Sequence, residues 1–313
     1  MIKFILSVLL VSVMKIAFPQ NIKPNKHVSF SKYLISSTVK LENVGDTVKD
    51  GKLIAFESTG TAFYYLFQID KYQIPVLVTS YHVVQNTSLS RITFTKADTL
   101  LNTPQKGQLL EYDNLNNQNK WIKHPKYDLA ILPLNPIMET IRFEQKSNIY
   151  FVPFDETVIP KDSTIASLSA IETLLMIGYP KGYWDAKNNY PIVRRGTTAT
   201  PLFSDFNNRN EFLLDIPIYS GSSGSPVVLF NEGFFTINGK PISGDRLYLL
   251  GIAVQSIDLK AQDKINNSTI ENPLNIAVVV KASALEDFKP ILSNLINSQQ
   301  NFIKYLRNNN KRH

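Results

Sequence analysis

A serine that could act as a nucleophile lies in a glycine-rich turn between two apolar segments. Residues 220–225 of this turn have the sequence SGSSGS. Glycines let the backbone fold closely, so that a hydroxyl is exposed while nearby amides converge on one point. Ser223 is therefore the candidate nucleophile, and the N–H groups of Gly221 and Ser223 are expected to form an oxyanion hole. Alone, such a stretch is more often a flexible linker, but apolar strands on both sides and Pro226 after it argue against one.

A nucleophilic serine needs a base, and His82 is the candidate among the four histidines. It follows the apolar segment Val76–Thr79, where a buried strand is expected to end. Histidine can accept and return a proton near neutral pH because its unperturbed pKa is about 6.5. His27 and His313 lie near the chain ends, and His124 is expected at a solvated surface because its neighbours are polar. A single histidine after an apolar strand is more often structural, so this assignment depends on its partners.

Asp128 is the candidate partner for this histidine. It stands directly before the apolar run Leu129–Leu134, at the start of an expected strand. A carboxylate there could accept the second ring proton of the histidine, fix its tautomer and stabilise the imidazolium during the reaction. The alternative is an aspartate that only caps a turn.

The composition indicates a globular protein and limits its chemistry. The chain has 313 residues, of which 43% are hydrophobic and 19% charged, so disorder is not expected. It contains no cysteine, which excludes disulfides, thiolate metal sites and a cysteine nucleophile. Covalent catalysis must use an oxygen nucleophile or lysine. We expect no metal and no cofactor.

The formal net charge of +7 is concentrated at the two ends of the chain. Six of the basic residues lie in end segments without acids, namely Lys3, Lys15, Lys304, Arg307, Lys311 and Arg312. The rest carries about +1, so a nucleic-acid partner is not expected. The basic tail is expected to be solvated. Weak contact with an anionic membrane surface, through the leader or the tail, is the alternative.

Residues 1–20 have the features of a secretory signal peptide. Lys3 precedes a largely apolar segment, residues 4–14, which is too short to cross a bilayer because a spanning helix needs about 20 residues. We expect cleavage between Ala17 and Asn21 and a secreted or periplasmic protein. A retained membrane anchor and a buried N-terminal helix are the alternatives.

From about Tyr33 onward, short runs rich in β-branched and aromatic residues alternate with turn residues, which predicts an all-β protein. A polar segment around Pro160 separates two sets of five or six strands, so we predict β-barrels over residues 33–160 and 161–283. Apolar residues at helical spacing predict a C-terminal α-helix and basic tail over residues 284–313. The expected strands include 53–58, 62–68, 75–79, 91–96, 129–134, 174–177, 192–198, 211–217, 226–230, 247–254 and 274–280.

The three chemical segments together resemble the trypsin-like serine peptidases, closest to the disulfide-free bacterial, Deg-like branch. The family pattern is Thr-Ala-x-His, Asp-Leu-Ala and Gly-x-Ser-Gly-Gly/Ser-Pro in that order. Here TSYH stands at 79–82, DLA at 128–130 and GSSGSP at 221–226. Segments 58–63 and 176–182 are similar to the strand before the histidine and to the opening strand of the second barrel.

The resemblance covers about residues 50–285. It implies the chymotrypsin-type fold, with two six-stranded antiparallel β-barrels, the histidine and aspartate in the first and the serine in the second. It also implies a serine endopeptidase that cleaves protein or peptide substrates through an acyl-enzyme. The alternatives are a catalytically inactive fold that binds peptides by strand addition, and a membrane-tethered protein in which the peptidase fold is secondary.

The sequence departs from the family pattern at three small residues. Ser222 stands where animal members place an aspartate that pairs with a newly freed N-terminus, so activation by that ion pair is not expected. Ser80 replaces the usual alanine and Ser225 the usual glycine. Both replacements are small and leave the triad assignment intact.

Substrate preference follows from the resemblance alone. The base of the specificity pocket is expected at Pro217, where no acid is present, so a small or apolar side chain is expected rather than lysine or arginine. An inward-pointing Asp215 would change that expectation. The segment 194–196 is expected either at the mouth of the cleft or in a structural turn. The substrate-pairing strand is expected at Val254, Gln255 and Ser256.

Overall fold

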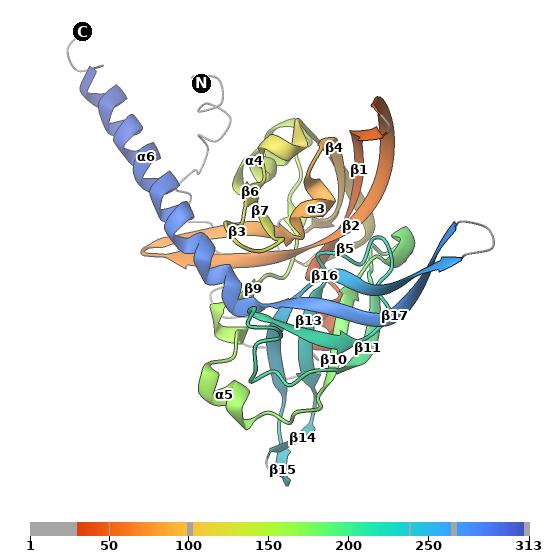
Figure 1. Ribbon diagram of the computed structural model, residues 1–313. Helices are drawn as coiled ribbons and strands as arrows, with labels where there is room; N and C mark the ends of the chain where they lie inside the picture. The colour runs from red at the N-terminus through yellow and green to blue at the C-terminus, as the bar shows by residue number, and fades with distance from the viewer. Residues whose placement is uncertain (1–29, 50, 99–102, 238, 264–267, 310–313) are drawn as a thin grey trace.

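The computed structural model describes residues 30–49, 51–98, 103–237, 239–263 and 268–309. It consists mostly of β-strands in two sheets, with a long helix at the C-terminal end (Figure 1). The predicted signal peptide, residues 1–20, lies outside the described residues. Within the described part of the chain, no helix is long and apolar enough to cross a membrane.

The first half of the chain forms a nine-stranded sheet. Seven strands follow the order β5-β4-β1-β2-β3-β7-β6, while β8 pairs with β4 and β9 with β2. Their bounds are β1 Thr38–Lys49, β2 Lys52–Ile69, β3 Tyr72–Thr79, β4 Thr87–Ala97, β5 Pro104–Leu115, β6 Ile122–Lys123, β7 Ala130–Pro133, β8 Ile149–Tyr150 and β9 Phe154–Asp155.

A six-stranded antiparallel barrel was expected here. The sheet instead has nine strands, β9 is parallel to β2, and among the described strands only those of the second half close into a barrel. The expected strands 53–58 and 62–68 are one continuous strand, β2, because Gly60 stays extended and pairs with Leu41 of β1. A side chain at Gly60 would run into Val83, so close packing explains this glycine without a turn.

The second half forms the predicted six-stranded antiparallel barrel. It closes in the order β10-β11-β12-β17-β16-β13. The bounds are β10 Thr173–Gly178, β11 Ile192–Thr198, β12 Glu211–Asp215, β13 Pro226–Asn231, β16 Arg246–Asp263 and β17 Ser268–Lys281. Between β13 and β16, β14 (Phe234–Ile237) and β15 (Lys240–Ser243) form a hairpin that projects from the barrel (Figure 1). The all-β fold class is thereby confirmed.

The helices are short except at the C-terminal end, where the predicted helix is confirmed as α6, Phe288–Asn309. The ten-residue α4, Asn135–Glu144, was not predicted, although Pro136 in its first turn and the buried Ile137 and Ile141 one turn apart suit a helix. The other helical elements are α2 Ser31–Leu34, α3 Tyr81–Val84, α5 Asp162–Ser167, η1 Asn117–Asn119, η2 Glu156–Val158, η3 Pro180–Gly182 and η4 Ala282–Asp287.

One hydrophobic cluster joins the two halves. It contains buried residues of the first sheet, of the barrel and of the C-terminal segment, among them Phe63, Val78, Leu129, Ile252, Val280, Leu285 and Phe288. The strand ends that carry the candidate site therefore meet over a shared core. The break between the sheets falls between β9 and β10, and a division of the chain at residues 160 and 161 stays a prediction.

Candidate active site

Ser223 lies in the connection from β12 to β13, and we call residues 217–225 the serine loop. Gly221 and Gly224 both have φ of +88°, a conformation that side chains disfavour. A Cβ at Gly224 would lie 2.0 Å from the carbonyl oxygen of Thr61. The glycine pattern in the sequence thus has a structural cause, since the loop folds directly against β2.

Thr61 of β2 holds the serine loop from the first half of the chain. Its N–H donates to the carbonyl oxygen of Ser223 at 3.0 Å, and its hydroxyl donates to that of Gly221 at 2.7 Å. The Thr79 hydroxyl in turn donates to the carbonyl oxygen of Thr61 at 2.6 Å. Since Thr79 ends the strand that leads to His82, these bonds tie the serine and histidine segments to one strand.

The carbonyl oxygen of Ala253 in β16 makes a second link between the same segments. It accepts from the N–H of Gly224 at 2.8 Å and from the hydroxyl of Ser80 at 3.3 Å. The N–H of Ala253 donates to the carbonyl oxygen of Ser225 at 2.9 Å. One barrel residue therefore contacts the positions that follow Ser223 and precede His82.

The amides expected to form the oxyanion hole belong to Gly221, which is buried, and to Ser223. The N–H of Ser222 donates to the carbonyl oxygen of Tyr219 at 2.8 Å, and the N–H of Gly224 is used by Ala253. Among the hydrogen bonds of the described residues, none uses the N–H of Gly221 or Ser223. Ser223 is half-buried. Two unengaged amides on either side of one residue can hold a developing negative oxygen.

His82 and Asp128 form a direct pair. His82 Nδ1 lies 2.5 Å from Asp128 Oδ2, and the backbone N–H of His82 donates to Oδ1 at 2.9 Å. The N–H of Tyr81 also donates to the carbonyl oxygen of Asp128, at 3.2 Å. With the carboxylate accepting at Nδ1, Nε2 is the ring atom that can take a proton.

The structure brings the three predicted triad segments together, but it differs at one contact. No hydrogen bond between the Ser223 hydroxyl and the His82 ring is found among the described residues. Catalytic hydrogen bonds are often long or misaligned before substrate binds.

His124 is not the solvated surface residue that the sequence predicts. Its side chain is completely buried, and its Nδ1 accepts the N–H groups of Lys126 and Tyr127, each at 3.0 Å. Burial lowers the pKa of this imidazole. The prediction was wrong because η4 and α6 cover the ring, which packs 5.0 Å from that of Phe288 and lies 3.0 Å from the carbonyl oxygen of Ala284.

The residues expected to bind substrate lie beside the serine loop. The pairing of β13 with β16 ends at Ile252. Among the described strands, residues 254–256 of β16 therefore have β17 as a neighbour on one side and no strand on the other. The Val254 side chain packs into the shared core, while Gln255 is exposed and Ser256 half-buried.

Arg194 contacts the expected base of the specificity pocket, which the sequence did not predict. Its Nη1 donates to the carbonyl oxygen of Pro217 at 2.5 Å, and its guanidinium lies 5.1 Å from the centre of the Tyr219 ring. Burial lowers the pKa of the guanidinium. Arg194 thus holds the start of the serine loop.

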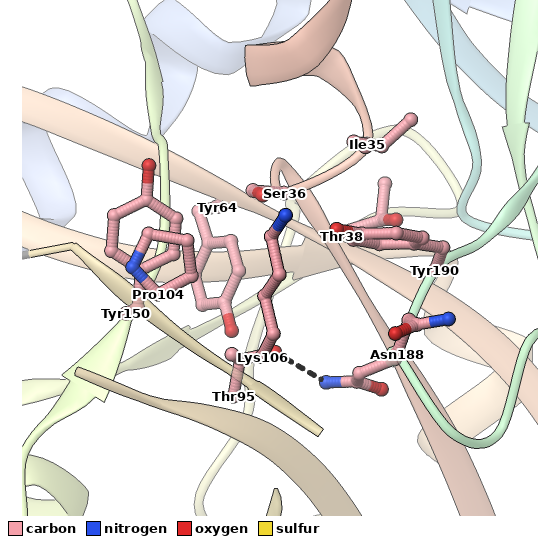
Figure 2. Close-up of a pocket in the computed structure, with 11 residues that line it drawn as sticks. Ile35, Ser36, Thr38, Tyr64, Thr95, Pro104, Lys106, Tyr150, Asn188 and Tyr190 are labelled. Atoms are coloured by element: carbon pink, nitrogen blue, oxygen red, sulfur yellow. Dashed lines mark hydrogen bonds between the residues drawn. The ribbon is translucent and has the colours of Figure 1, made fainter. Parts of the chain in front are cut away.

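A separate small cavity lies where the loop between β10 and β11 meets the first sheet (Figure 2). Ser36, Tyr64, Lys106 and Tyr150 are among its lining residues. Asn189 closes it and donates from Nδ2 to the Thr95 hydroxyl at 3.0 Å. Its volume of about 20 Å³ suits a single water, so it is too small for a substrate side chain.

Comparison with known families decides what kind of protein this site belongs to. The family model of the trypsin-like peptidase domain matches residues 60–235, more than half of the chain. The chain belongs to this family. All three triad candidates of this trypsin-like peptidase fall inside the matched region, and membership supports a peptidase function.

No curated protein matches the chain. Among solved structures, the chain is similar to a thermostable serine protease, AL20, from an extremophilic microorganism. The two are 10% identical with a TM-score of 0.40, and the similarity covers 82% of this chain and 97% of the other.

Proposed function

We propose that this trypsin-like peptidase is a serine endopeptidase with Ser223 as nucleophile, His82 as general base and Asp128 as the residue that orients the base. The observation that carries the proposal is the contact of 2.5 Å between His82 Nδ1 and Asp128 Oδ2. It leaves Nε2 for the proton of a serine whose loop is hydrogen-bonded to Thr61 of β2, and Thr61 also accepts from Thr79 at the end of the strand leading to His82.

In the proposed reaction, Ser223 Oγ attacks the carbonyl carbon of a peptide bond and its proton passes to His82 Nε2. The N–H groups of Gly221 and Ser223 stabilise the oxyanion. Collapse of the tetrahedral intermediate breaks the C–N bond, and His82 gives its proton to the leaving amine. Water then hydrolyses the acyl-enzyme, with His82 as base again, while Asp128 stays ionised throughout.

A fluorophosphonate probe tests the nucleophile directly. We expect the wild-type chain to be labelled at Ser223 and Ser223→Ala to remain unlabelled, with peptide hydrolysis reduced by about 10⁴ to 10⁶-fold. Ser220→Ala is the matched control, because it removes an exposed hydroxyl from the same loop and should leave labelling intact. Equal labelling of Ser223→Ala and wild type would refute the assignment.

The second candidate is a catalytically inactive member that binds peptides by adding a strand beside residues 254–256. The lack of a hydrogen bond between Ser223 and His82 in the described structure favours it. This candidate predicts that the wild-type chain is not labelled and that an extended peptide still binds in a fluorescence anisotropy titration. Labelling of Ser223 would eliminate it.

We further propose that the protein is exported and that residues 1–20 are removed. The support is the short apolar segment behind Lys3. N-terminal sequencing of the mature protein should find a start between Ala17 and Asn21. An intact Lys15 in a membrane fraction would support the anchored alternative instead.

A further inference from the structure

The buried His124 begins the connection that carries Asp128. We call residues 124–129, which join β6 to β7, the aspartate loop. The His124 side chain is 0% exposed, and its ring centre lies 5.0 Å from that of Phe288 in α6. The aspartate loop is therefore packed against the C-terminal segment from the inside of the molecule.

Both ring nitrogens of His124 bind backbone. Nδ1 accepts two N–H groups, those of Lys126 and Tyr127, so the ring proton is on Nε2, which donates to the carbonyl oxygen of Ala284 at 3.0 Å. The backbone closes around the ring, since the N–H of His124 donates to the carbonyl oxygen of Leu129 at 2.9 Å. The position between Tyr127 and Leu129 is Asp128.

The carboxylate of Asp128 depends on this loop for its placement. Within the described residues, both hydrogen bonds found for the carboxylate come from His82, one from Nδ1 and one from the backbone N–H. Its remaining support is the backbone of Asp128, whose carbonyl oxygen accepts from the N–H of Tyr81 at 3.2 Å. The residues directly before Asp128 are Lys126 and Tyr127, whose backbone N–H groups donate to His124 Nδ1.

We propose that His124 is a positioning residue for the catalytic pair, because its Nδ1 holds the aspartate loop in the conformation that places Asp128 against His82. The proposal rests on the proposed function for its effect on turnover. The bond from Nε2 to Ala284 has a different role, since it attaches the loop to η4.

Two substitutions separate the two nitrogens. In His124→Asn, the amide oxygen takes the place of Nδ1 and can accept the same two N–H groups, as in an Asx turn, while the bond to Ala284 is lost. In His124→Gln, the amide nitrogen takes the place of Nε2 and can still donate to Ala284, while the two N–H groups lose their acceptor. Each variant therefore keeps the hydrogen bonds of one ring nitrogen and loses those of the other.

We expect kcat to separate the variants. His124→Asn should stay within about 3-fold of wild type, whereas His124→Gln should lose about 10- to 100-fold in kcat with KM unchanged, since small misplacements of catalytic groups have effects of this size. The acidic limb of the pH–rate profile of His124→Gln should also move to lower pH, because the imidazolium of His82 would lose its stabilisation by Asp128. Equal losses in the two variants, or no loss in either, would overturn the proposal.

Lys289→Met is the matched structural control. Lys289 attaches the first turn of α6 to Glu156 at 2.6 Å, so its loss weakens the docking of the C-terminal helix without contacting the aspartate loop. Its melting temperature should fall while kcat stays unchanged. If kcat of Lys289→Met falls as far as that of His124→Gln, the effect is one of helix docking and the proposal is wrong.

Proton NMR of the His82 ring gives a readout that does not need turnover. The Nδ1 proton between His82 and Asp128 should give a low-field signal in wild type and in His124→Asn, and the signal should be lost in His124→Gln. If the wild-type chain is inert but the signal follows this pattern, the proposed function fails and the positioning role stands. A signal that persists in His124→Gln overturns the positioning role.

Discussion

The serine loop and the aspartate loop are held in different ways. The serine loop has glycines at φ of +88° and is fixed by hydrogen bonds from other strands, chiefly those of Thr61 and Ala253. The aspartate loop is fixed by His124, a member of the loop itself. Substitutions that disturb the serine loop should therefore weaken the contacts between the two halves of the molecule. The conformation of the aspartate loop should be most sensitive to substitution of His124.

The two loops also differ in how far apart in the sequence their contacting residues lie. The contacts of the serine loop with Thr61 join residues about 160 positions apart, and those with Ala253 and Arg194 come from other strands of the barrel. The two N–H groups that His124 accepts lie two and three residues along the chain. The serine loop is consequently a product of tertiary assembly, whereas the aspartate loop combines these local bonds with bonds to distant residues, from the Tyr81 N–H to the Asp128 carbonyl oxygen and from His124 Nε2 to that of Ala284.

The largest effect is expected from Gly224→Ala, which tests the close approach of the serine loop to β2. The new Cβ would lie 2.0 Å from the backbone oxygen of Thr61, on a residue that must keep a positive φ. We expect a loss of at least about 3 kcal/mol in the free energy of unfolding, and no detectable fluorophosphonate labelling. Urea denaturation and labelling measure the two effects.

Gly233→Ala is the control for the backbone strain alone. Gly233 also has a positive φ, +80°, but a Cβ there meets no atom within 4 Å. Its cost should be about 1 to 2 kcal/mol, with labelling unchanged. If the two variants were equally unstable, the close approach of the serine loop would not be what the glycine at 224 serves.

Thr61→Val tests the hydrogen bonds that join the two halves at the serine loop. The substitution keeps the shape of this fully buried residue but removes the hydroxyl that donates to Gly221 and accepts from the N–H of Tyr179 at 3.1 Å. We expect a loss of about 1 to 3 kcal/mol in stability, since buried partners are left unsatisfied. A drop of about 10-fold in kcat should accompany it. Thr47→Val, at an exposed position of β1, should change neither quantity.

The pH dependence of stability tests the aspartate loop. Burial lowers the pKa of His124, so the unfolded chain binds a proton as pH falls through about 6.5 while the folded chain does not until lower pH. Stability from this group is therefore full above pH 6.5 and is lost as pH falls below it. Desolvation is the largest cause of the lowered pKa of His124. The hydrogen bond to Ala284 and the Asp287 carboxylate, with Oδ2 3.4 Å from Nε2, act to raise this pKa, and Lys126 lowers it further.

His124→Asn should flatten this acid-side loss, because asparagine does not titrate. Urea denaturation of both chains between pH 5 and pH 8 measures the difference. If the two chains lost stability in parallel, the acid sensitivity would come from other groups.

The sequence was most informative where chemistry and local pattern coincide. Strand β11 has the predicted bounds, Ile192–Thr198, because it begins directly after Pro191 and is rich in β-branched residues. His82 was predicted from its place after an apolar run and Asp128 from its place before one, and the structure pairs them.

What the sequence could not predict depends on contacts between distant residues. The burial of His124 requires η4 and α6 to cover it, and the contact of Arg194 with Pro217 requires the barrel to close. The path of β2 through Gly60 could not be predicted for the same reason, since Val83 explains this glycine only once the sheet is formed.

The smallest effect is expected from Ser225→Ala, at the end of the serine loop. The Ser225 hydroxyl is buried and has no hydrogen-bond partner among the described residues, so removing it relieves a desolvated polar group. We expect a gain of about 1 kcal/mol, or about 2 °C in melting temperature.

Ser225→Gly should lack this gain, because glycine adds conformational freedom to the unfolded chain. If the serine loop is held through backbone contacts, loss of its own buried hydroxyl should strengthen it, whereas loss of the ring of His124 should weaken the aspartate loop. A destabilised Ser225→Ala would show that the hydroxyl has a partner in solution and that the serine loop also depends on a side chain of its own.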